Sequence, residues 1–259
     1  MRHIHVIGCK RSGTTLMMEL LWNSYRFAGR SNHEASIFNC KSSDSDETLY
    51  LSKKPADTTK IEKIFLADSD LFLVGVQRDP RSVIASTHPS KKDLYFADFY
   101  KWEQCKNALS RLHDHPRFLL VRYEDLLTNP DREQERISQK FVLLKDIRKF
   151  SEYPNGSNPS YQANRSLGGT RPFDQKRISG WMNHLPRIKG QLILHPHLPE
   201  VLINTGYENN DEWTKLVDHI NPYYQSYKDG GPNFLRATET KLRFKWKTRK
   251  YMKQLNAKF

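Results

Sequence analysis

The segment 8–15, Gly-Cys-Lys-Arg-Ser-Gly-Thr-Thr, combines two glycines with two cations and three hydroxyl groups. It lies between the apolar run 3–8 and a stretch with helical spacing of apolar residues, 14–27. Glycine lets the backbone turn tightly, so that successive N–H groups converge on an anion at the positive end of the following helix. The polar side chains available there are those of Lys10, Arg11, Ser12, Thr14 and Thr15. We call this segment the phosphate loop, because its composition predicts that it holds a phosphate group.

Gly8 and Gly13 have the spacing of the nucleoside-triphosphate loop G-x-x-x-x-G-K-[ST], but Thr14 stands where that loop has lysine. Without this lysine, ATP or GTP chemistry loses its main charge clamp on the β- and γ-phosphates. Two alternatives stay open at this point. One is a nucleoside or small-molecule kinase, for which Asp79 is the obvious metal-binding carboxylate. The other is a non-catalytic module that binds a nucleotide or a nucleic acid, which the net charge favours.

A second anion site is predicted directly after the apolar run 71–77. Arg78 offers a planar fork of donors to phosphate oxygens. Ser86, eight residues later, adds a hydroxyl from the helix that Pro80 begins. Alone, this pattern also fits a capped helix start with a solvent-facing arginine. Together with the phosphate loop, it indicates a ligand with two anionic groups.

The segment 10–16 resembles the 5′-phosphosulfate loop of sulfotransferases that use 3′-phosphoadenosine 5′-phosphosulfate (PAPS). Arg78 and Ser86 have the spacing of the 3′-phosphate signature in the same family. The resemblance implies transfer of a sulfuryl group from PAPS to a hydroxyl or an amine, without a metal. It runs from residue 3 to about residue 210 and leaves the acceptor open: a carbohydrate, a lipid, a peptide or a small alcohol.

Two further segments extend this resemblance. Residues 120–130 are similar to a strand and turn of the family, which implies that Tyr123 lies near the adenosine. Residues 178–186 are similar to the closing segment of the tyrosylprotein-sulfotransferase-like branch, where a serine before the tryptophan binds the nucleotide, here Ser179. The implied nucleotide site therefore comprises Lys10, Arg11, Ser12, Gly13, Thr14, Thr15, Arg78, Ser86, Tyr123 and Ser179.

Sulfuryl transfer also needs a base for the acceptor proton and stabilisation of the leaving phosphate. Lys10 and Arg11 are placed for the stabilising role. By resemblance, Glu34 occupies the place of the carboxylate base that several branches of the family use. Some branches use a histidine, so His33 and His88 are alternatives. Glu34 has a second interpretation, an exposed loop carboxylate paired with Arg30.

Three unbroken apolar runs indicate strands that are covered on both faces, as in a parallel sheet. These runs are 3–8, 71–77 and 117–122. Stretches of helical character separate or follow them, at 14–27, 81–87, 98–113 and 131–143. The alternation predicts an α/β, three-layer, P-loop-like fold with a central parallel β-sheet flanked by helices. The polar segments 40–60 and 151–176 are expected to be loops that shape the acceptor pocket.

The charge of this 259-residue chain is unevenly distributed. It has 42 Lys and Arg against 29 Asp and Glu, a net charge of +13, of which residues 236–259 carry +8. We therefore expect a sulfotransferase domain over 1–235 and a basic tail over 236–259. The tail has three open interpretations: a solvated terminal strand or helix, a contact with a membrane surface, or a clamp on an anionic acceptor. A nucleic-acid partner is not expected, because no supporting motif is present.

No apolar run approaches the length of a membrane span, and the N-terminal run is too short for a signal peptide. Cys9, Cys40 and Cys105 are widely spaced, which argues against a disulfide framework or a zinc finger. These observations predict a cytoplasmic protein without a metal.

Overall fold

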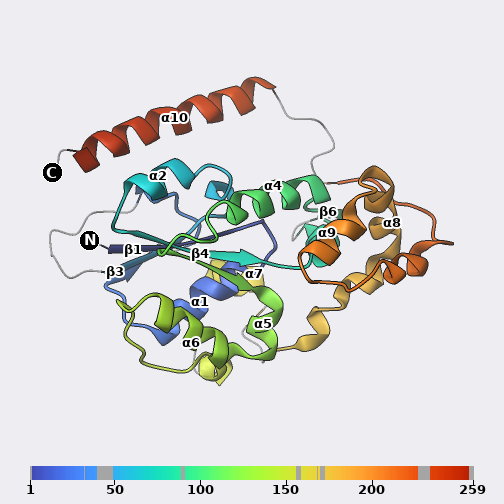
Figure 1. Cartoon of the computed structure of the whole chain (residues 1–259), viewed down its shortest axis with the longest axis horizontal. Coiled ribbons are helices and arrows are strands. Elements are labelled where there is room, and N and C mark those ends of the chain that lie inside the picture. The colour runs from blue at the N-terminus through green and yellow to red at the C-terminus, as the bar shows by residue number, and fades with distance from the viewer. Residues whose placement is uncertain are drawn as a thin grey trace.

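The computed structural model describes residues 2–31, 33–39, 49–88, 91–155, 159–167, 169, 173–226 and 234–256. Within these residues, five strands form a parallel sheet in the order β2-β3-β1-β4-β7. The strands are β1 (Arg2–Gly8), β2 (Gly29–Arg30), β3 (Leu49–Lys53), β4 (Leu71–Gln77) and β7 (Phe118–Arg122). Helices cover both faces of the sheet (Figure 1). The predicted α/β fold with a central parallel sheet is confirmed.

The alternating side chains of β4 show why both faces are apolar. Val74 and Val76 pack into one hydrophobic cluster, whereas Leu71 and Leu73 belong to another, and all four are fully buried. The first cluster lies under α1 (Thr14–Ser24), α5 (Tyr123–Thr128) and α6 (Pro130–Lys140). The second lies under α2 (Glu62–Ala67) and α4 (Phe99–Ser110). The unbroken apolar run of this strand therefore serves two helix layers at once.

Helix α1 ends three residues before the predicted end at residue 27. Tyr25 takes an extended backbone, with φ −133°, and bridges Asp146 in antiparallel fashion. The N–H of Ile147 donates to the carbonyl of Ser24, so the chain leaves the helix to pair with the segment that follows α6. Tertiary pairing thus overrides the helical spacing of the last apolar residues.

The expectation of a loop over 40–60 is wrong for residues 49–53, because these form β3. This strand pairs in parallel with β1 over its whole length and is followed by the short 3₁₀ helix η2 (Pro55–Asp57). Residues 40–48 lie outside the described part of the chain. β3 was missed because five residues with a serine and a lysine among them give a weak strand signal.

The second predicted loop, 151–176, also contains regular structure. It holds the helix α7 (Tyr161–Leu167) together with most of η3 (Phe150–Asn155) and the start of η4 (Gln175–Arg177). Residues 156–158, 168 and 170–172 lie outside the described residues. The described residues of this segment therefore form one helix and short 3₁₀ turns, and α7 and η3 contact α1 (Figure 1).

The C-terminal part of the domain packs beside α3 (Pro80–Ile84) and α4 around a third hydrophobic cluster. Its elements are the helices α8 (Leu185–Leu194) and α9 (Leu198–Asn204) and the 3₁₀ helices η5 (Gly180–His184) and η6 (Glu212–Val217). A short antiparallel hairpin of β5 (Thr87–His88) and β6 (Lys91–Tyr95) connects α3 to α4. Arg81 lies at the centre of the cluster, with its guanidinium carbon 4.2 Å from the Trp181 ring and 5.0 Å from the Trp213 ring. This cluster fixes α3 and η5 next to each other at the wall of the cavity described below.

The basic tail is helical. Helix α10 (Phe234–Asn256) lies along α2 and η1 (Ile37–Asn39), on the outside of one helix layer (Figure 1). The tail is therefore a helix and not a strand, and its role stays a prediction. Across the described ranges, no helix has both the length and the apolar character needed to cross a lipid bilayer.

Candidate active site

The phosphate loop connects the end of β1 to the start of α1 through two glycines with positive φ. Gly8 has φ 151° and Gly13 has φ 99°. A Cβ on Gly13 would lie only 2.2 Å from the Tyr123 ring, so this position needs glycine for space as well as for conformation. The N–H of Gly8 donates to Thr58 Oγ1 over 2.8 Å, which ties the loop to the turn after β3.

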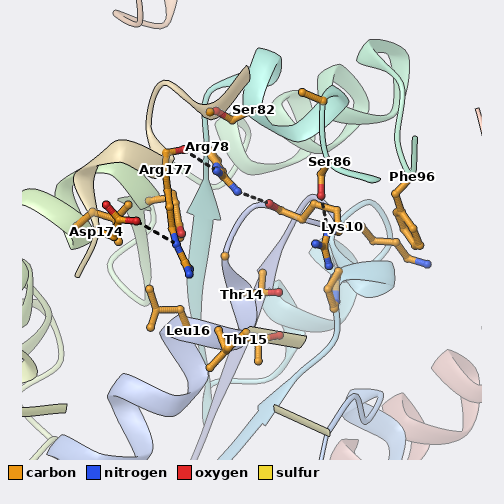
Figure 2. Close-up of a pocket in the computed structure, with 18 of the residues that line it drawn as sticks. Lys10, Thr14, Thr15, Leu16, Arg78, Ser82, Ser86, Phe96, Asp174 and Arg177 are labelled. Carbon is orange, nitrogen blue, oxygen red and sulfur yellow. Dashed lines mark hydrogen bonds and ion pairs between the residues drawn. The ribbon is translucent and has the colours of Figure 1, made fainter. Parts of the chain in front are cut away.

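A cavity of about 630 Å³ opens above this loop, at the carboxyl ends of the parallel strands. This is where open α/β sheets bind their ligands. Ten of the residues singled out in the sequence line it: Lys10, Arg11, Gly13, Thr14, Thr15, His33, Glu34, Arg78, Ser86 and Tyr123. Figure 2 shows Arg78 and Ser86 beside the phosphate loop, whereas the Lys10 side chain extends toward Phe96, with Nζ 5.3 Å from the ring centre. The phosphate loop and the second anion site therefore border one cavity.

Arg11 connects the two predicted anion sites directly. Its Nε–H donates to Ser86 Oγ over 2.6 Å, and its carbonyl oxygen accepts a hydrogen bond from Arg78 Nη1 over 3.3 Å. Burial and the nearby Arg78 charge both lower the pKa of Arg11 from its ordinary value. Two guanidinium groups that repel each other at a cavity wall are stabilised when an anion lies between them.

Arg78 is held in place from three sides. Its guanidinium carbon lies 4.3 Å from the centre of the Tyr123 ring, and its Nη2 donates to the Arg177 carbonyl over 3.1 Å (Figure 2). Trp102 Nε1 donates to the Arg78 carbonyl over 2.8 Å, which fixes the backbone at the end of β4. Arg78 Nε is buried and has no hydrogen-bond partner among the described residues. The Arg78 side chain is therefore oriented before a ligand binds, and its Nε–H is available to donate a hydrogen bond.

Glu34 and His33 line the opposite part of the cavity, and a buried lysine stands behind them. Lys53, at the end of β3, is 1 % exposed; its Nζ lies 3.7 Å from Glu34 Oε1 and donates to Thr15 Oγ1 over 3.0 Å. Burial lowers the pKa of Lys53, and the Glu34 carboxylate partly offsets this effect. Burial and the Lys53 charge also lower the pKa of His33.

The alternative pairing of Glu34 with Arg30 is wrong. Arg30 Nη1 instead donates to Glu19 Oε1 over 2.9 Å, and its guanidinium stacks on Trp22 at 4.8 Å. Glu34 is thus left at the cavity, with Lys53 as its cationic neighbour. The side chain of His88, the other histidine alternative, lies outside the part that the structure describes.

Comparison with known proteins identifies the fold family. Residues 1–145 match the sequence profile of the sulfotransferase domain. The chain belongs to the sulfotransferase domain family. The matched residues of this sulfotransferase contain the phosphate loop, Glu34, Arg78, Ser86 and Tyr123, whereas Ser179 lies beyond them. No curated protein matches the sequence.

Two solved structures share the fold of this sulfotransferase. One is the sulfotransferase domain of the olefin synthase from Synechococcus PCC 7002, with 14 % identity, 70 % of this chain and 87 % of that chain covered, and a TM-score of 0.54. The other is the sulfotransferase domain from the curacin biosynthetic pathway, with 14 % identity and a TM-score of 0.56. That alignment covers 79 % of this chain and 97 % of the other chain. The likeness extends the agreement in fold beyond the matched N-terminal residues.

Ser12 and Ser179 do not line the cavity of the sulfotransferase. The hydroxyl of Ser12 is fully buried, and a Cβ on Gly8 would lie 2.8 Å from it, so it points back under the loop. The hydroxyl of Ser179 donates to the Lys176 carbonyl over 3.4 Å, although its neighbour Gly180 lines the cavity. A side-chain role for these two serines in nucleotide binding stays a prediction.

Three basic side chains at or next to the cavity were not singled out from the sequence: Lys53, Arg177 and His184. The position of Lys53 can be predicted once β3 is recognised as a strand. A residue at the carboxyl end of a parallel strand lies at the edge of the sheet where ligands bind. Arg177 and His184 come from 3₁₀ helices, which leave no periodic signal in a sequence. Tyr95 Oη lies 3.1 Å from His184 Nδ1, and burial lowers the pKa of this imidazole.

Asp79 is the carboxylate that the kinase alternative requires, but it is already paired with another residue of the protein. It caps α3 by accepting from the Arg81 N–H, and its carboxylate pairs with the Arg81 guanidinium at 2.7 Å. Within the described ranges, no group of three or more His, Cys, Asp or Glu side chains is arranged to hold a metal ion. Asp79 thus has a structural function in the described fold.

Proposed function

We propose that this sulfotransferase transfers the sulfuryl group of PAPS to a hydroxyl or an amine of its acceptor. One observation carries the proposal: Arg11 of the phosphate loop and Ser86 of the second anion site are in direct contact, at 2.6 Å, on the wall of one cavity. A ligand with anionic groups at both ends of a small nucleoside fits this arrangement. The two sites would otherwise concentrate positive charge without a partner.

In this proposal the 5′-phosphosulfate lies over the N–H groups of the phosphate loop, with Lys10 and Arg11 as charged donors and the hydroxyls of Thr14 and Thr15 beside them. The 3′-phosphate is bound by Arg78 and Ser86. The adenosine lies near Tyr123, whose ring already stacks on Arg78. Residues 1–235 form the catalytic unit, and the basic tail 236–259 is outside it.

The transfer step breaks one bond and forms another at sulfur. The acceptor oxygen or nitrogen attacks sulfur, the bond from sulfur to the bridging oxygen breaks, and its electron pair stays on the 5′-phosphate of 3′-phosphoadenosine 5′-phosphate (PAP). Glu34 takes the proton of the acceptor. Lys10 and Arg11 stabilise the charge that develops on the leaving phosphate. No step of this sequence requires a metal.

Lys53 supports both halves of this step. Its ammonium lies between Glu34 and Thr15, so it links the proposed base to the phosphate loop. A buried positive charge at this point keeps the Glu34 side chain oriented. It also adds to the positive potential around the transferred group, where it acts in a low-dielectric environment.

Calorimetry separates this proposal from the kinase alternative. We expect PAP to bind more tightly than adenosine 5′-monophosphate, which lacks the 3′-phosphate, and more tightly than ATP. Tight binding of ATP without a preference for the 3′-phosphate would contradict the proposal. With labelled PAPS, transfer of the label to members of a panel of phenols, sugars, aliphatic alcohols and amines then measures the activity and identifies the acceptor class.

A further inference from the structure

Helix α10 has an inner face that is fixed to the domain. Phe244 and Tyr251 both contact Phe38 of η1 edge to face, with ring centres 5.1 and 6.0 Å apart. The Tyr251 hydroxyl donates to Asp68, and Lys60 Nζ lies 5.5 Å from the Phe244 ring. These contacts set the rotation of the helix about its axis, and therefore decide which of its side chains point away from the protein.

The outer face presents two large apolar side chains to solvent. Leu242 is 61 % exposed and Trp246 is 62 % exposed. Residues three and four apart share one face of a helix, so this face consists of Leu242, Trp246, Arg249, Lys250 and Lys253. Lys250 Nζ lies 5.8 Å from the Trp246 ring, which places a cation directly beside the indole.

Positive charge surrounds these two apolar residues. Residues 239–256 contain seven Lys or Arg and one acid, Glu239. That acid is paired with Arg243, at 2.7 Å. Arg249, Lys250 and Lys253 are all exposed. The face therefore combines an apolar centre with a cationic surround.

We propose that this outer face of α10 binds the surface of a lipid bilayer that contains anionic headgroups. Tryptophan and leucine side chains enter the region between headgroups and acyl chains, and lysine and arginine side chains contact the anionic headgroups. The helix would lie in the plane of the surface, with its inner face still packed on α2 and η1. This inference concerns where the enzyme is held and is independent of the reaction proposed above.

The composition of the face favours lipid over other anionic partners. A nucleic acid is bound by cations with aromatic rings that stack on exposed bases. The aliphatic side chain of Leu242 cannot stack on a base. At a bilayer interface, by contrast, an aliphatic side chain next to an indole is stabilised. A second copy of the chain is disfavoured, because it would bring two faces of like charge together.

Co-sedimentation of the full chain with vesicles tests the proposal. We expect binding to phosphatidylcholine vesicles that contain about 30 % phosphatidylglycerol, and loss of most of it without the anionic lipid. Trp246→Ser combined with Leu242→Ser should weaken binding at least about tenfold, and so should Lys250→Glu combined with Lys253→Glu. Circular dichroism of each variant establishes that α10 remains folded.

Matched variants elsewhere on the surface serve as controls. Leu194→Ser with Leu216→Ser removes two apolar side chains of similar exposure, 54 % and 49 %, from other elements. Arg132→Glu with Lys140→Glu reverses two charges on the exposed side of α6. Both controls should bind the vesicles like the natural chain. Equal loss in the controls and in the α10 variants would overturn the proposal.

A spectroscopic readout reports directly on Trp246. Vesicles with brominated acyl chains should quench part of the tryptophan fluorescence of the natural chain. The Trp246→Phe variant should still bind but lose that quenching. If duplex or single-stranded DNA competes for the face and the Trp246→Ser/Leu242→Ser variant binds vesicles as well as the natural chain does, the partner is a nucleic acid and the lipid proposal is wrong.

Discussion

Arg11 donates its Nε–H to Ser86 Oγ over 2.6 Å, although 75 residues separate them in the chain. Arg11 also has a positive φ of 71°, and it is the one non-glycine residue with positive φ in the described ranges. The backbone strain of this conformation is offset by the bond to Ser86 and by the hydrogen bond that the Arg11 carbonyl accepts from Arg78. The two anion sites are therefore built as one unit.

Replacing Arg78 should weaken nucleotide binding. Arg78→Ala removes a pre-oriented guanidinium, and we expect PAP to bind about 10- to 100-fold more weakly, the effect of losing a charged hydrogen-bond donor. Calorimetry with PAP measures this loss. Arg111→Ala is the control, because Arg111 is an exposed arginine paired with Glu62 and should leave PAP affinity unchanged. Unchanged PAP binding by Arg78→Ala would remove this residue from the nucleotide site.

Replacing Glu34 should separate binding from turnover. Glu34→Ala should bind PAP like the natural chain and lose about 10²- to 10⁴-fold in kcat, as expected for a general base. The assay follows label transfer from PAPS to whichever acceptor class the panel identifies. His33→Ala is the informative partner variant and should retain most of its activity. The reverse pattern, with an active Glu34→Ala and an inactive His33→Ala, would make His33 the base.

Gly13 should not tolerate a side chain. Gly13→Ala places a methyl group 2.2 Å from the Tyr123 ring at a backbone φ of 99°. We expect the free energy of unfolding to fall by about 1–3 kcal/mol, the cost of one strained residue, and PAP affinity to fall with it. Gly180→Ala is the control, since its Cβ would have no atom within 4 Å. Thermal unfolding measures both variants, and equal stability would show that Tyr123 moves freely.

Stability should decrease as the pH falls below about 6.5, the ordinary pKa of histidine. Burial, with a smaller effect of His5, lowers the pKa of His3 well below its usual value. In the window between the lowered pKa and 6.5, the unfolded chain binds a proton that the folded chain does not, so acid favours unfolding. His3→Gln should reduce this slope by up to about 1.4 kcal/mol per pH unit. Chemical denaturation at several pH values tests it, with the exposed His219→Gln as a control that keeps the slope.

The sequence predicted the parts of the site that depend on local chemistry. The glycines at 8 and 13, the cations between them and the strand before them define a phosphate loop whatever the rest of the chain does. The same holds for Arg78, because the carboxyl end of a parallel strand lies at the edge of the sheet where ligands bind. Ser86 differs from the prediction in its element, because α3 ends at Ile84 and Ser86 follows the helix. The buried strands at 3–8 and 71–77 were predictable because both of their faces must be apolar.

Only the tertiary structure decided how these parts meet. It brought Lys53 to Glu34 and Thr15 through β3, a strand too short and too polar to be recognised in the sequence. It paired Arg30 with Glu19 and directed the Ser12 hydroxyl away from the cavity. It also determined which face of α10 points to solvent. Each of these outcomes depends on contacts between residues far apart in the chain. Local residue patterns set what a segment can bind, whereas packing sets which neighbour each side chain receives.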